Sequence, residues 1–404
     1  MNGVKKHEDA LPAHVFLSHP VYKTDFTSAA DVYLYDSTGR KYMDFESGIW
    51  CASLGHNHPA IAASIHKQLD KVIHLGATVT SPLTEETAIT LLRHTPYEHG
   101  RAVFLSSGSE AVELSLKLAR LFTGRNQLVT FTRSYLGAYG FSGQLDKTNY
   151  WQLVDIDNCL RCSEEKCTWS CRALKHINPD MTAAFIIEPV LASGGILFPP
   201  VKCVKFLAGE INTAGGLFIT NEVTTGLGRT GRWLGIEHHE VTPDLIVFGK
   251  TLGNGYPVSA VAMSRHVADM LLTKDFYYVQ SHQNDPLGCA AAKAVLETLE
   301  AEKLIDRSQK LGDFFKKQLG ELQSKHNLIR DIRGVGLMYG LELNSKLTGG
   351  EKGVVTIVKN MLAHGFYIGF KPKLNLLRFF PPYTIREEHI LELCRILDKI
   401  FLKL

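Results

Sequence analysis

The sequence lacks long hydrophobic runs, a large excess of charge of either sign, and a high density of cysteine. No stretch of about 18 apolar residues could span a membrane, and the polar segment 1–13 has no apolar centre like that of a signal peptide. The 44 basic and 41 acidic residues give a net charge of +3, which excludes a polyanion as the expected partner. Eight cysteines among 404 residues do not form a disulfide scaffold. We therefore expect a cytoplasmic protein that binds neither nucleic acid nor membranes.

What is present is the ordinary composition of a globular protein, with 45% hydrophobic and 21% charged residues. Beyond about residue 100, strand and helix patterns alternate, which predicts an α/β fold with a mostly parallel sheet. The expected strands of this sheet are residues 102–105, 128–131, 184–187, 217–220 and 245–248. After about residue 300, charged helices and short strands are typical of a second, smaller α+β domain.

These patterns predict the division of the chain into domains. Residues 1–46 form an N-terminal arm and hairpin that belong to the small domain, and residues 47–295 form the large domain. Residues 296–404 form the remainder of the small domain. A cysteine-rich insertion at residues 158–172 interrupts the large domain.

The stretch 243–257, PDLIVFGKTLGNGYP, combines a buried strand with a sharp loop that contains glycine. Lys250 then lies at the carboxyl end of the strand, where open α/β sheets bind their ligands. A lysine in a partly dry crevice has a lowered pKa and attacks carbonyl groups as a free amine. The alternative is a solvated lysine after a core strand. The other motifs of the chain favour the reactive lysine.

Another strand turns into a helix through Ser107, Gly108 and Ser109. Such a turn points free backbone N–H groups and hydroxyls at one place, which makes an anion site. The alternative for Ser109 is that it only caps the helix.

Four cysteines lie within 13 residues of the polar insertion, in the spacing C-x2-C-x4-C-x3-C. Four thiolates so close together suit tetrahedral zinc or an iron–sulfur cluster. The predicted ligands are Cys159, Cys162, Cys167 and Cys171. The alternative is reduced or paired cysteines, and in either case we expect a structural role away from the chemistry.

Residues 226–231, GLGRTG, fit the dinucleotide-binding pattern G-x-G-x-x-G. That interpretation needs a crossover helix and then an acidic residue at the end of the next strand. Residues 232–244 are too few for such a helix and are broken by Gly235 and Pro243. An NAD-dependent dehydrogenase is therefore a remote alternative.

Further motifs join these in a recognisable order: SYLG at 134–137, EPV at 188–190, NEVTTGLGRTG at 221–231, SHQNDPL at 281–287 and LLRFFPP at 376–382. With Lys250, they resemble the class III aminotransferases of the ornithine and ω-amino acid type, over nearly the whole chain. The resemblance implies a fold-type I pyridoxal-phosphate enzyme with a large α/β/α sheet domain and a smaller α+β domain. It also implies that Lys250 carries the cofactor as a Schiff base and later moves the proton.

The resemblance assigns further roles. Ser107, Gly108 and Ser109 would hold the cofactor phosphate, and Tyr135 would lie against the cofactor face. Glu188 would lie near the substrate and pair with Arg378, whose fork fits a carboxylate. The alternative for Arg378 is a surface charge beside a strand.

Other residues also carry expected contacts. Asn221 and Val223 would contact the cofactor, whereas Ser281 and His282 would reach the cofactor phosphate of a neighbouring subunit. We therefore expect a homodimer or a dimer of dimers.

One departure from the family pattern concerns the electronics of the cofactor. The family normally has aspartate where this chain has Asn221. A carboxylate there keeps the ring nitrogen protonated, so that the ring stabilises the carbanion. Asn221 can still bond to this nitrogen through its oxygen or its NH₂ group. We interpret this as a tuned or slowed enzyme, with an inactive homologue or an altered sequence as alternatives.

The other departures make the expected pocket less polar. Leu136 stands where the family usually has histidine, and Leu191 and Thr224 stand where glutamine is common. Trp50 resembles the tryptophan of ω-transaminases that use bulky amines, although it could equally be a packing residue.

The predicted function is ping-pong transfer of an amino group between an amino acid or amine and a keto acid or aldehyde, with pyridoxal 5'-phosphate as cofactor. An amino acid racemase, epimerase or lyase on the same scaffold is the first alternative, because all share the step at Cα. A metal-stabilised homologue that does not catalyse a reaction is the remote alternative.

Overall fold

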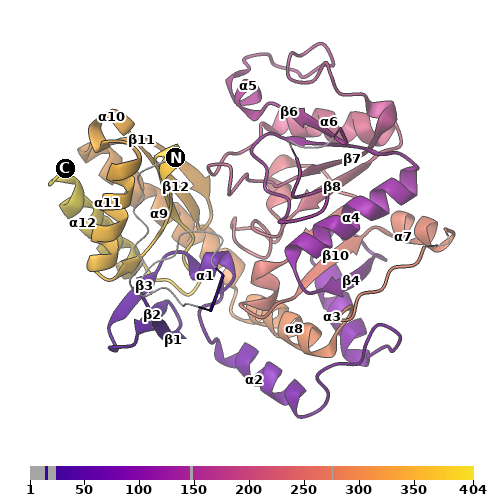
Figure 1. Ribbon diagram of the computed structural model, residues 1–404, viewed down its shortest axis with the longest axis horizontal. Coiled ribbons are helices and arrows are strands. Elements are labelled where there is room, and N and C mark those ends of the chain that lie inside the picture. Colours follow the sequence, from indigo (N-terminus) through magenta and orange to yellow (C-terminus); the bar gives the residue numbers. More distant parts are fainter. Residues whose placement is uncertain (1–13, 17–23, 146–148, 275) are drawn as a thin grey trace.

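The computed structural model describes residues 14–16, 24–145, 149–274 and 276–404. A seven-stranded sheet forms its larger body (Figure 1), and the strands follow the order β4-β10-β9-β8-β7-β5-β6. Only β10 runs antiparallel to its neighbours β4 and β9 in this sheet of the described chain, so the predicted mostly parallel α/β sheet is confirmed. The strands are β4 (Arg101–Leu105), β5 (Gln127–Phe131), β6 (Trp151–Val154), β7 (Thr182–Ile187), β8 (Leu217–Asn221), β9 (Leu245–Phe248) and β10 (Ser259–Met263).

The central strands are apolar on both faces because helices cover both sides of the sheet. Successive residues of β9 show this, since Ile246 packs into one core and Val247 into another. On the Val247 side lie α4 (Gly108–Thr123) and α7 (Arg265–Leu272), and on the Ile246 side lie α6 (Val201–Thr213) and α8 (Pro286–Ala301). The larger body is therefore a three-layer α/β/α arrangement.

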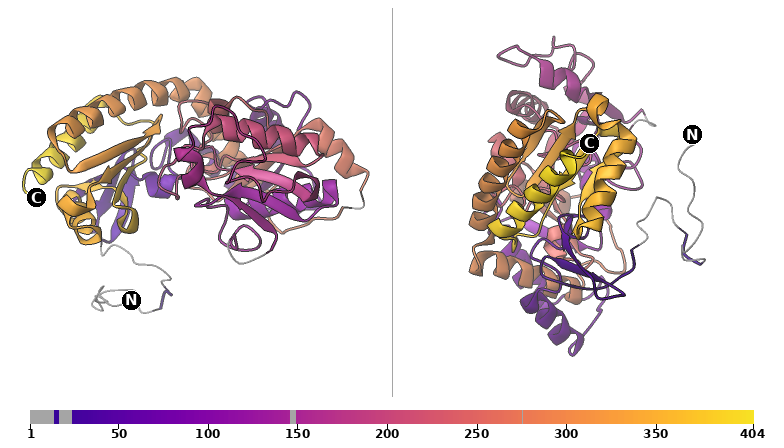
Figure 2. Two further views of the ribbon diagram at one scale, coloured as in Figure 1. Left: turned by 90° about the horizontal axis from the view of Figure 1, so that it is seen from above. Right: turned by 90° about the vertical axis from the view of Figure 1, so that its left-hand side faces the viewer.

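Two four-stranded sheets form the second body. It lies beside the first body in Figure 1 and in the left view of Figure 2. One follows the order β1-β2-β3-β13 and the other the order β11-β12-β15-β14. Their strands are β1 (Phe26–Ala30), β2 (Tyr33–Asp36), β3 (Lys41–Asp44), β11 (Ile329–Val335), β12 (Met338–Leu343), β13 (Phe366–Tyr367), β14 (Gly369–Lys371) and β15 (Leu376–Phe379). The long helices of this body are α9 (Leu304–Lys325), α11 (Glu351–Ala363) and α12 (Glu387–Phe401).

The N-terminal strands belong to the same body as the C-terminal part of the chain, because β3 pairs in parallel with β13. This pairing supports the division at residues 46 and 295, which we keep as a proposal. Most of the predicted N-terminal arm lies outside the described residues. The shorter helices are α1 (Ser47–Trp50), α2 (Pro59–Leu69), α3 (Pro82–Leu92), α5 (Ile156–Arg161) and α10 (Ser345–Thr348). None of the described helices is both long and apolar enough to cross a bilayer.

Candidate active site

Lys250 begins a short 3-10 turn, Lys250–Gly253, directly after the buried strand β9. Its φ of 44° is unusual for a residue with a side chain, and such backbone strain clusters at functional sites. The Nζ atom donates a hydrogen bond to Oγ1 of Thr224 at 2.9 Å. Burial lowers the pKa of Lys250, and the electrostatic influence of the nearby Cys51 and Glu188 side chains opposes that shift only in part. The structure thus provides a half-buried amine that loses its proton more readily than a surface lysine.

A cavity of about 380 Å³ opens in front of this amine. It brings together residues that lie far apart in the sequence, and nine of the predicted site residues line it. These are Trp50, Ser107, Gly108, Ser109, Tyr135, Asn221, Val223, Lys250 and Arg378. The remaining lining residues are Ile49, Leu136, Gly137, Ser193 and Thr224.

One end of the cavity is formed by the N-terminus of α4. Ser107 caps this helix, since its Oγ accepts the N–H of Glu110 at 3.3 Å and the Glu110 carboxylate accepts the N–H of Ser107 at 2.8 Å. The alternative that Ser109 is the cap is therefore wrong. Ser109 Oγ accepts the N–H of Ala138 at 3.1 Å. Its own O–H donates to no other described residue and is therefore available to a ligand.

Gly108 is required at this helix end because two loops approach each other closely. A Cβ atom at position 108 would lie 2.9 Å from Cγ1 of Val223. A helix N-terminus with a glycine and a free hydroxyl is suited to bind an anion such as a phosphate group.

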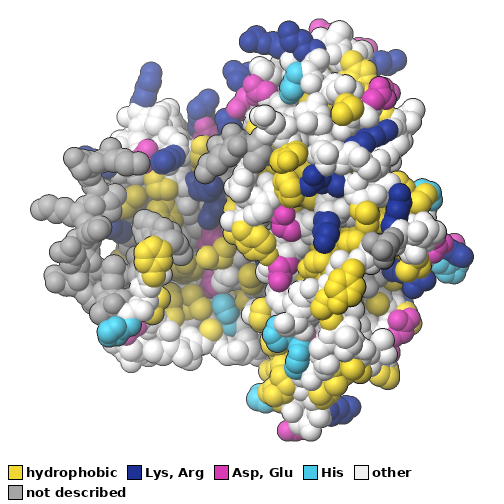
Figure 3. Space-filling model, turned by 45° about the vertical axis from the view of Figure 1, so that its right-hand side comes forward, with side chains coloured by type: hydrophobic (Ala, Val, Ile, Leu, Met, Phe, Trp, Pro, Cys, Tyr) yellow, Lys and Arg dark blue, Asp and Glu magenta, His cyan; other side chains and the backbone are white. Residues whose placement is uncertain are grey.

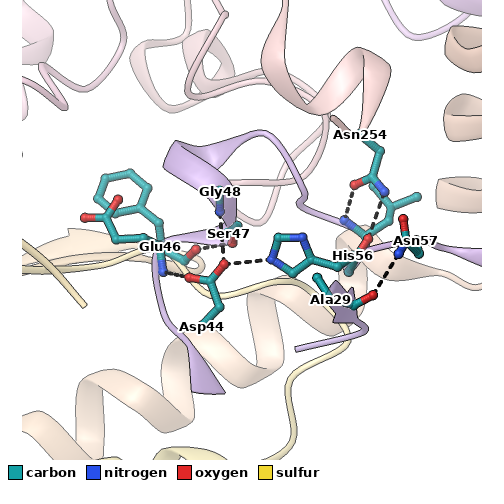
Figure 4. A network of polar contacts seen from close by, with 11 residues as sticks. Ala29, Asp44, Glu46, Ser47, Gly48, His56, Asn57 and Asn254 are labelled. Carbon is teal, nitrogen blue, oxygen red and sulfur yellow. Dashed lines mark hydrogen bonds and ion pairs between the residues drawn. The ribbon is translucent and has the colours of Figure 1, made fainter. Parts of the chain in front are cut away.

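The opposite wall is formed by a left-handed turn at α1. Ser47, Gly48, Ile49 and Trp50 have φ angles of 46°, 58°, 56° and 72°, a conformation that costs energy for a β-branched residue such as Ile49. The carboxylate of Asp44 holds the turn in place (Figure 4), because it accepts the N–H of Gly48 at 3.0 Å.

The same carboxylate makes two further contacts. It accepts the N–H of Glu46 at 2.7 Å and contacts Nε2 of His56 at 2.8 Å. Asp44 therefore fixes where the side chains of Glu46 and Trp50 lie.

The loop of Trp50 is bonded to the loop of Lys250. The side chain of Asn254 accepts the N–H of Leu54 at 2.8 Å and donates to the carbonyl of Gly55 at 2.9 Å. The hydroxyls of Ser53 and Thr251 lie 2.7 Å apart. Trp50 is consequently held so that its ring lies 5.0 Å from Nζ of Lys250.

Arg378 on β15 lies across the cavity and pairs with Glu46. Its Nη2 is 3.3 Å from Oε1 of Glu46, and Nε1 of Trp50 donates to Oε2 of the same carboxylate at 2.7 Å. The predicted pair of Arg378 with Glu188 is therefore wrong, because Glu46 at the end of β3 takes that place. Burial raises the pKa of Glu46 to about 7, although the charge of Arg378 lowers it. The Nε atom of Arg378 is buried and has no hydrogen-bond partner among the described residues.

Glu188 lies behind the cavity wall rather than in it. Its Oε2 accepts the N–H of Tyr135 at 2.7 Å. Burial raises the pKa of Glu188 to about 7, and the hydrogen bond from Tyr135 and the charge of Lys250 oppose this shift. Glu188 thus positions the backbone of Tyr135 and does not line the cavity.

Asn221 is the last residue of β8 and is 4% exposed. Its Oδ1 accepts the N–H of Val223 at 3.2 Å. The next residue, Glu222, points elsewhere, because its carboxylate accepts the N–H groups of Gly235 and Ile236 at 2.9 and 2.8 Å. Asn221 is therefore the polar side chain that β8 offers to the cavity.

Ser281 and His282 do not reach the cavity of their own chain. His282 lines a separate hollow beside Tyr256, and its Nδ1 lies 2.9 Å from Oδ2 of Asp285. Their contact with the phosphate of a neighbouring subunit stays a prediction.

Two of the four cysteines of the insertion, Cys159 and Cys167, both contact Cys203 on α6, which lies outside the predicted motif. Cys159 Sγ lies 3.8 Å from Sγ of Cys203. Among the described residues, the one group of three possible metal ligands that lie within 4.8 Å of one another is His74, His282 and Asp285. No three thiols of Cys159, Cys162, Cys167 and Cys171 lie within 4.8 Å of one another, so a metal bound by these residues stays a prediction.

Sequence reasoning missed Glu46, Ile49 and Ser193. Glu46 reaches Arg378 from the end of β3, and Ile49 takes part in the left-handed turn. Ser193 lines the cavity from the loop after β7. The acidic residue beside the tryptophan loop was a weak signal for Glu46, and the sequence carries no signal for Ser193.

Two of the three residues that are less polar than their counterparts in the family line the cavity itself. Leu136 and Thr224 line it, and Thr224 supplies the oxygen that Lys250 contacts. Leu191 is fully buried and bridges to Leu197, so it does not make the cavity less polar as predicted.

Comparisons with known proteins agree with one another. The family model described as aminotransferase class-III matches residues 17–401. The LysW-aminoadipate semialdehyde/glutamate semialdehyde transaminase of Sulfolobus acidocaldarius is 30% identical, with 92% of this chain and 93% of that protein covered. The leucine/methionine racemase of Thermococcus litoralis is 32% identical, with 89% and 86% covered. An aminotransferase structure from Bacillus anthracis has a TM-score of 0.88 at 25% identity, with 97% and 96% covered.

Proposed function

The chain belongs to the class III aminotransferases and is a pyridoxal-phosphate-dependent transaminase, and we propose that the cavity around Lys250 is its active site. The observation that carries this proposal is the half-buried amine of Lys250. It faces the same cavity as the anion-binding end of α4 and the polar side chain of Asn221. A reactive amine, a phosphate site and a partner for a ring nitrogen are the three groups that this cofactor requires.

The residues present fit the cofactor. Gly108 leaves room for a phosphate at the N-terminus of α4, and Ser107 and Ser109 add hydroxyl groups beside it. Tyr135 and Val223 line the space between this end and Lys250. When bound, pyridoxal phosphate supplies the aldehyde that combines with amines and the ring that withdraws electrons.

Lys250 holds the cofactor and moves the substrate proton at its Nζ atom. Because burial lowers its pKa, it has a larger neutral fraction than a surface lysine and can accept a proton. The hydroxyl of Thr224 at 2.9 Å orients the amine. The ring of Trp50 excludes water on the other side.

The substrate class follows from Arg378. A guanidinium that lines the cavity, and whose Nε has no hydrogen-bond partner among the described residues, is suited to a carboxylate. Ionised Glu46 pairs with Arg378 and so competes with a substrate carboxylate for it, whereas protonated Glu46 leaves Arg378 available to the substrate. We therefore propose amino acids as donors and keto acids as acceptors, with simple amines as weaker donors.

A racemase or epimerase is the second candidate. The relative from Thermococcus litoralis carries a racemase name, and Asn221 is the residue of this cavity that bears on the fate of the Cα proton. Both candidate functions, transaminase and racemase, use Lys250 to remove the Cα proton. They differ in the atom to which this proton is returned.

The assembly is proposed to be a homodimer. Exposed Tyr139, Leu272 and Tyr277 lie in the larger body, on whose surface Figure 3 shows hydrophobic side chains among charged ones. A groove of about 480 Å³ there is lined partly by Phe141 and Tyr278. Light scattering on the purified enzyme should give twice the chain mass, and a monomer would contradict the proposal. The cytoplasmic location and a metal in the cysteine-rich insertion stay predictions.

A spectroscopic half-reaction tests the function. The holoenzyme is mixed with α-amino acids, ω-amino acids and simple amines, one at a time, without acceptor. Conversion of the cofactor to its amine form by a donor confirms transamination and identifies the donor class. A cofactor that stays in its aldehyde form while the donor loses optical purity would favour the racemase, and no change with any donor would contradict both.

A further inference from the structure

We propose that Asn221 donates a hydrogen bond to the ring nitrogen of pyridoxal phosphate and holds this nitrogen without a proton. The proposal rests on the proposed function, because it assumes that the cofactor occupies the cavity around Lys250. The sequence left two choices open, since an amide offers an oxygen that accepts and an NH₂ group that donates. The contacts of Asn221 within the chain distinguish between them.

The amide of Asn221 has a defined orientation. The N–H of Val223 faces its oxygen at 3.2 Å. A backbone N–H can only donate, so the amide atom opposite it must be the oxygen. The other atom, Nδ2, makes no hydrogen bond to another described residue, and the residue lines the cavity. Nδ2 is thus the atom that Asn221 presents to a ligand.

This orientation selects the protonation state of the ring. A protonated ring nitrogen carries an N–H group, which would face the N–H groups of Nδ2 with no acceptor between them. If the amide flipped, its oxygen could accept from the ring, but Nδ2 would then face the N–H of Val223. Only an unprotonated ring nitrogen lets both sides of the amide form hydrogen bonds, because it accepts from Nδ2 while Oδ1 accepts from Val223.

The charges around the cavity also disfavour a protonated ring nitrogen. The charged side chains among its described lining residues are Lys250 and Arg378, both basic, so no lining carboxylate balances a positive ring. Glu188 lies behind Tyr135 and bonds to its backbone, and the Glu222 carboxylate is taken up by backbone N–H groups. Glu46 on the opposite wall is already bonded to Trp50 and paired with Arg378.

The consequence concerns the proton that Lys250 removes. Asn221 orients the ring as an aspartate would, but it supplies no charge to keep the nitrogen protonated. The ring then withdraws electrons less strongly, and removal of the Cα proton receives less assistance. The chain thereby keeps the position of the cofactor and weakens its electronic effect.

Nitrogen NMR of the holoenzyme tests this directly. The bound cofactor carries ¹⁵N at its ring nitrogen, and the spectrum is recorded for the wild type, Asn221→Asp and Asn360→Asp. We expect the wild-type signal at the position of an unprotonated pyridine. Asn221→Asp should move it upfield to that of a protonated ring, since a carboxylate stabilises the N–H form. Asn360 is the matched control, because it is exposed on α11 of the second body and does not line the cavity.

The outcomes separate the two proposals. A wild-type signal at the protonated position overturns the inference about Asn221 and leaves the proposed function intact. A wild-type protein that binds no labelled cofactor overturns the proposed function instead. Because the wild-type signal alone decides the inference, the result does not depend on whether Asn221→Asp folds.

Discussion

The cavity around Lys250 and the cysteine-rich insertion at 158–172 differ in how their predicted residues are brought together. Residues of the cavity come from positions 49 to 378 and still converge, because strand ends and bonded loops fix them. The four cysteines lie within 13 residues, yet no three of their thiols lie within 4.8 Å of one another. In the cavity, contacts such as those of Asn254 join one loop to the next, whereas Lys202 Nζ holds the insertion through the backbone carbonyl of Cys162.

This difference teaches that closeness in sequence is a poor guide to a site. Carboxyl ends of parallel strands meet at one edge of a sheet, so Asn221 and Lys250, each at the end of its strand, must lie near each other. Nothing comparable forces the thiols of a polar loop together. Substitutions in the two regions should therefore have very unequal effects.

The largest effect is expected for Lys250→Ala. Loss of the amine removes both the attachment of the cofactor and the group that moves the proton, so kcat should fall about 10³-fold or more. Steady-state kinetics with the best amino acid donor measure it. Lys205→Ala is the control, because that lysine pairs with Glu240 on the surface. Retention of more than a tenth of the activity would contradict the role of Lys250.

The next effect concerns stability and Glu188, whose pKa is raised by burial from 4.5 to about 7. A carboxyl with a raised pKa stabilises the fold fully below about pH 4.5, and this stability is lost as the pH rises through about 7. Glu188→Gln should therefore be more stable than the wild type at pH 8, by about 3 kcal/mol at most, and equal to it near pH 4.5. Urea unfolding at both pH values checks this, and a variant that is less stable at pH 8 would refute it.

Arg378→Ala should raise KM for amino acid and keto acid substrates about 10²-fold, because a carboxylate loses its buried partner. Arg378→Lys keeps the charge but loses the fork, so an intermediate KM is expected. Simple amines without a carboxylate serve as the control and should keep their KM in both variants. An equal loss for amines and amino acids would show that Arg378 is a structural residue.

The pH dependence of carboxylate binding should depend on Glu46, whose pKa is about 7. Ionised Glu46 competes for Arg378, so the affinity for a monocarboxylate inhibitor without an amino group should be highest below pH 7. It should then fall up to about tenfold per pH unit above it. Glu46→Gln should remove this slope, whereas Glu240→Gln on the surface should keep it. A slope that persists in Glu46→Gln would assign the titration to another group.

The smallest effect is expected in the insertion. Because Cys162 does not line the cavity around Lys250, Cys162→Ser should change kcat/KM less than about twofold. A larger fall would contradict this. The metal site predicted from the spacing requires stoichiometric zinc or iron in the purified wild type and its loss in Cys162→Ser. Metal analysis of both proteins measures this, and no metal in either protein would contradict the predicted site.

The sequence was sufficient for those parts of the site that local patterns define. Lys250 follows an apolar run, and Gly108 opens a helix after a strand, so local pattern alone places each of them at a sheet edge. Glu46 could not be placed, because its contact with Arg378 depends on how the two smaller sheets meet. Cys203 lies far along the chain from Cys159 and reaches it only through packing of α6.

The central claim is that Lys250 is the residue that carries the cofactor. Borohydride reduction of the holoenzyme, followed by digestion and peptide mass spectrometry, locates the lysine to which the cofactor becomes permanently attached. We predict that the pyridoxyl group is found on the peptide that contains Lys250, and that Lys250→Ala yields no such peptide. Attachment to another lysine in the wild type would contradict the account.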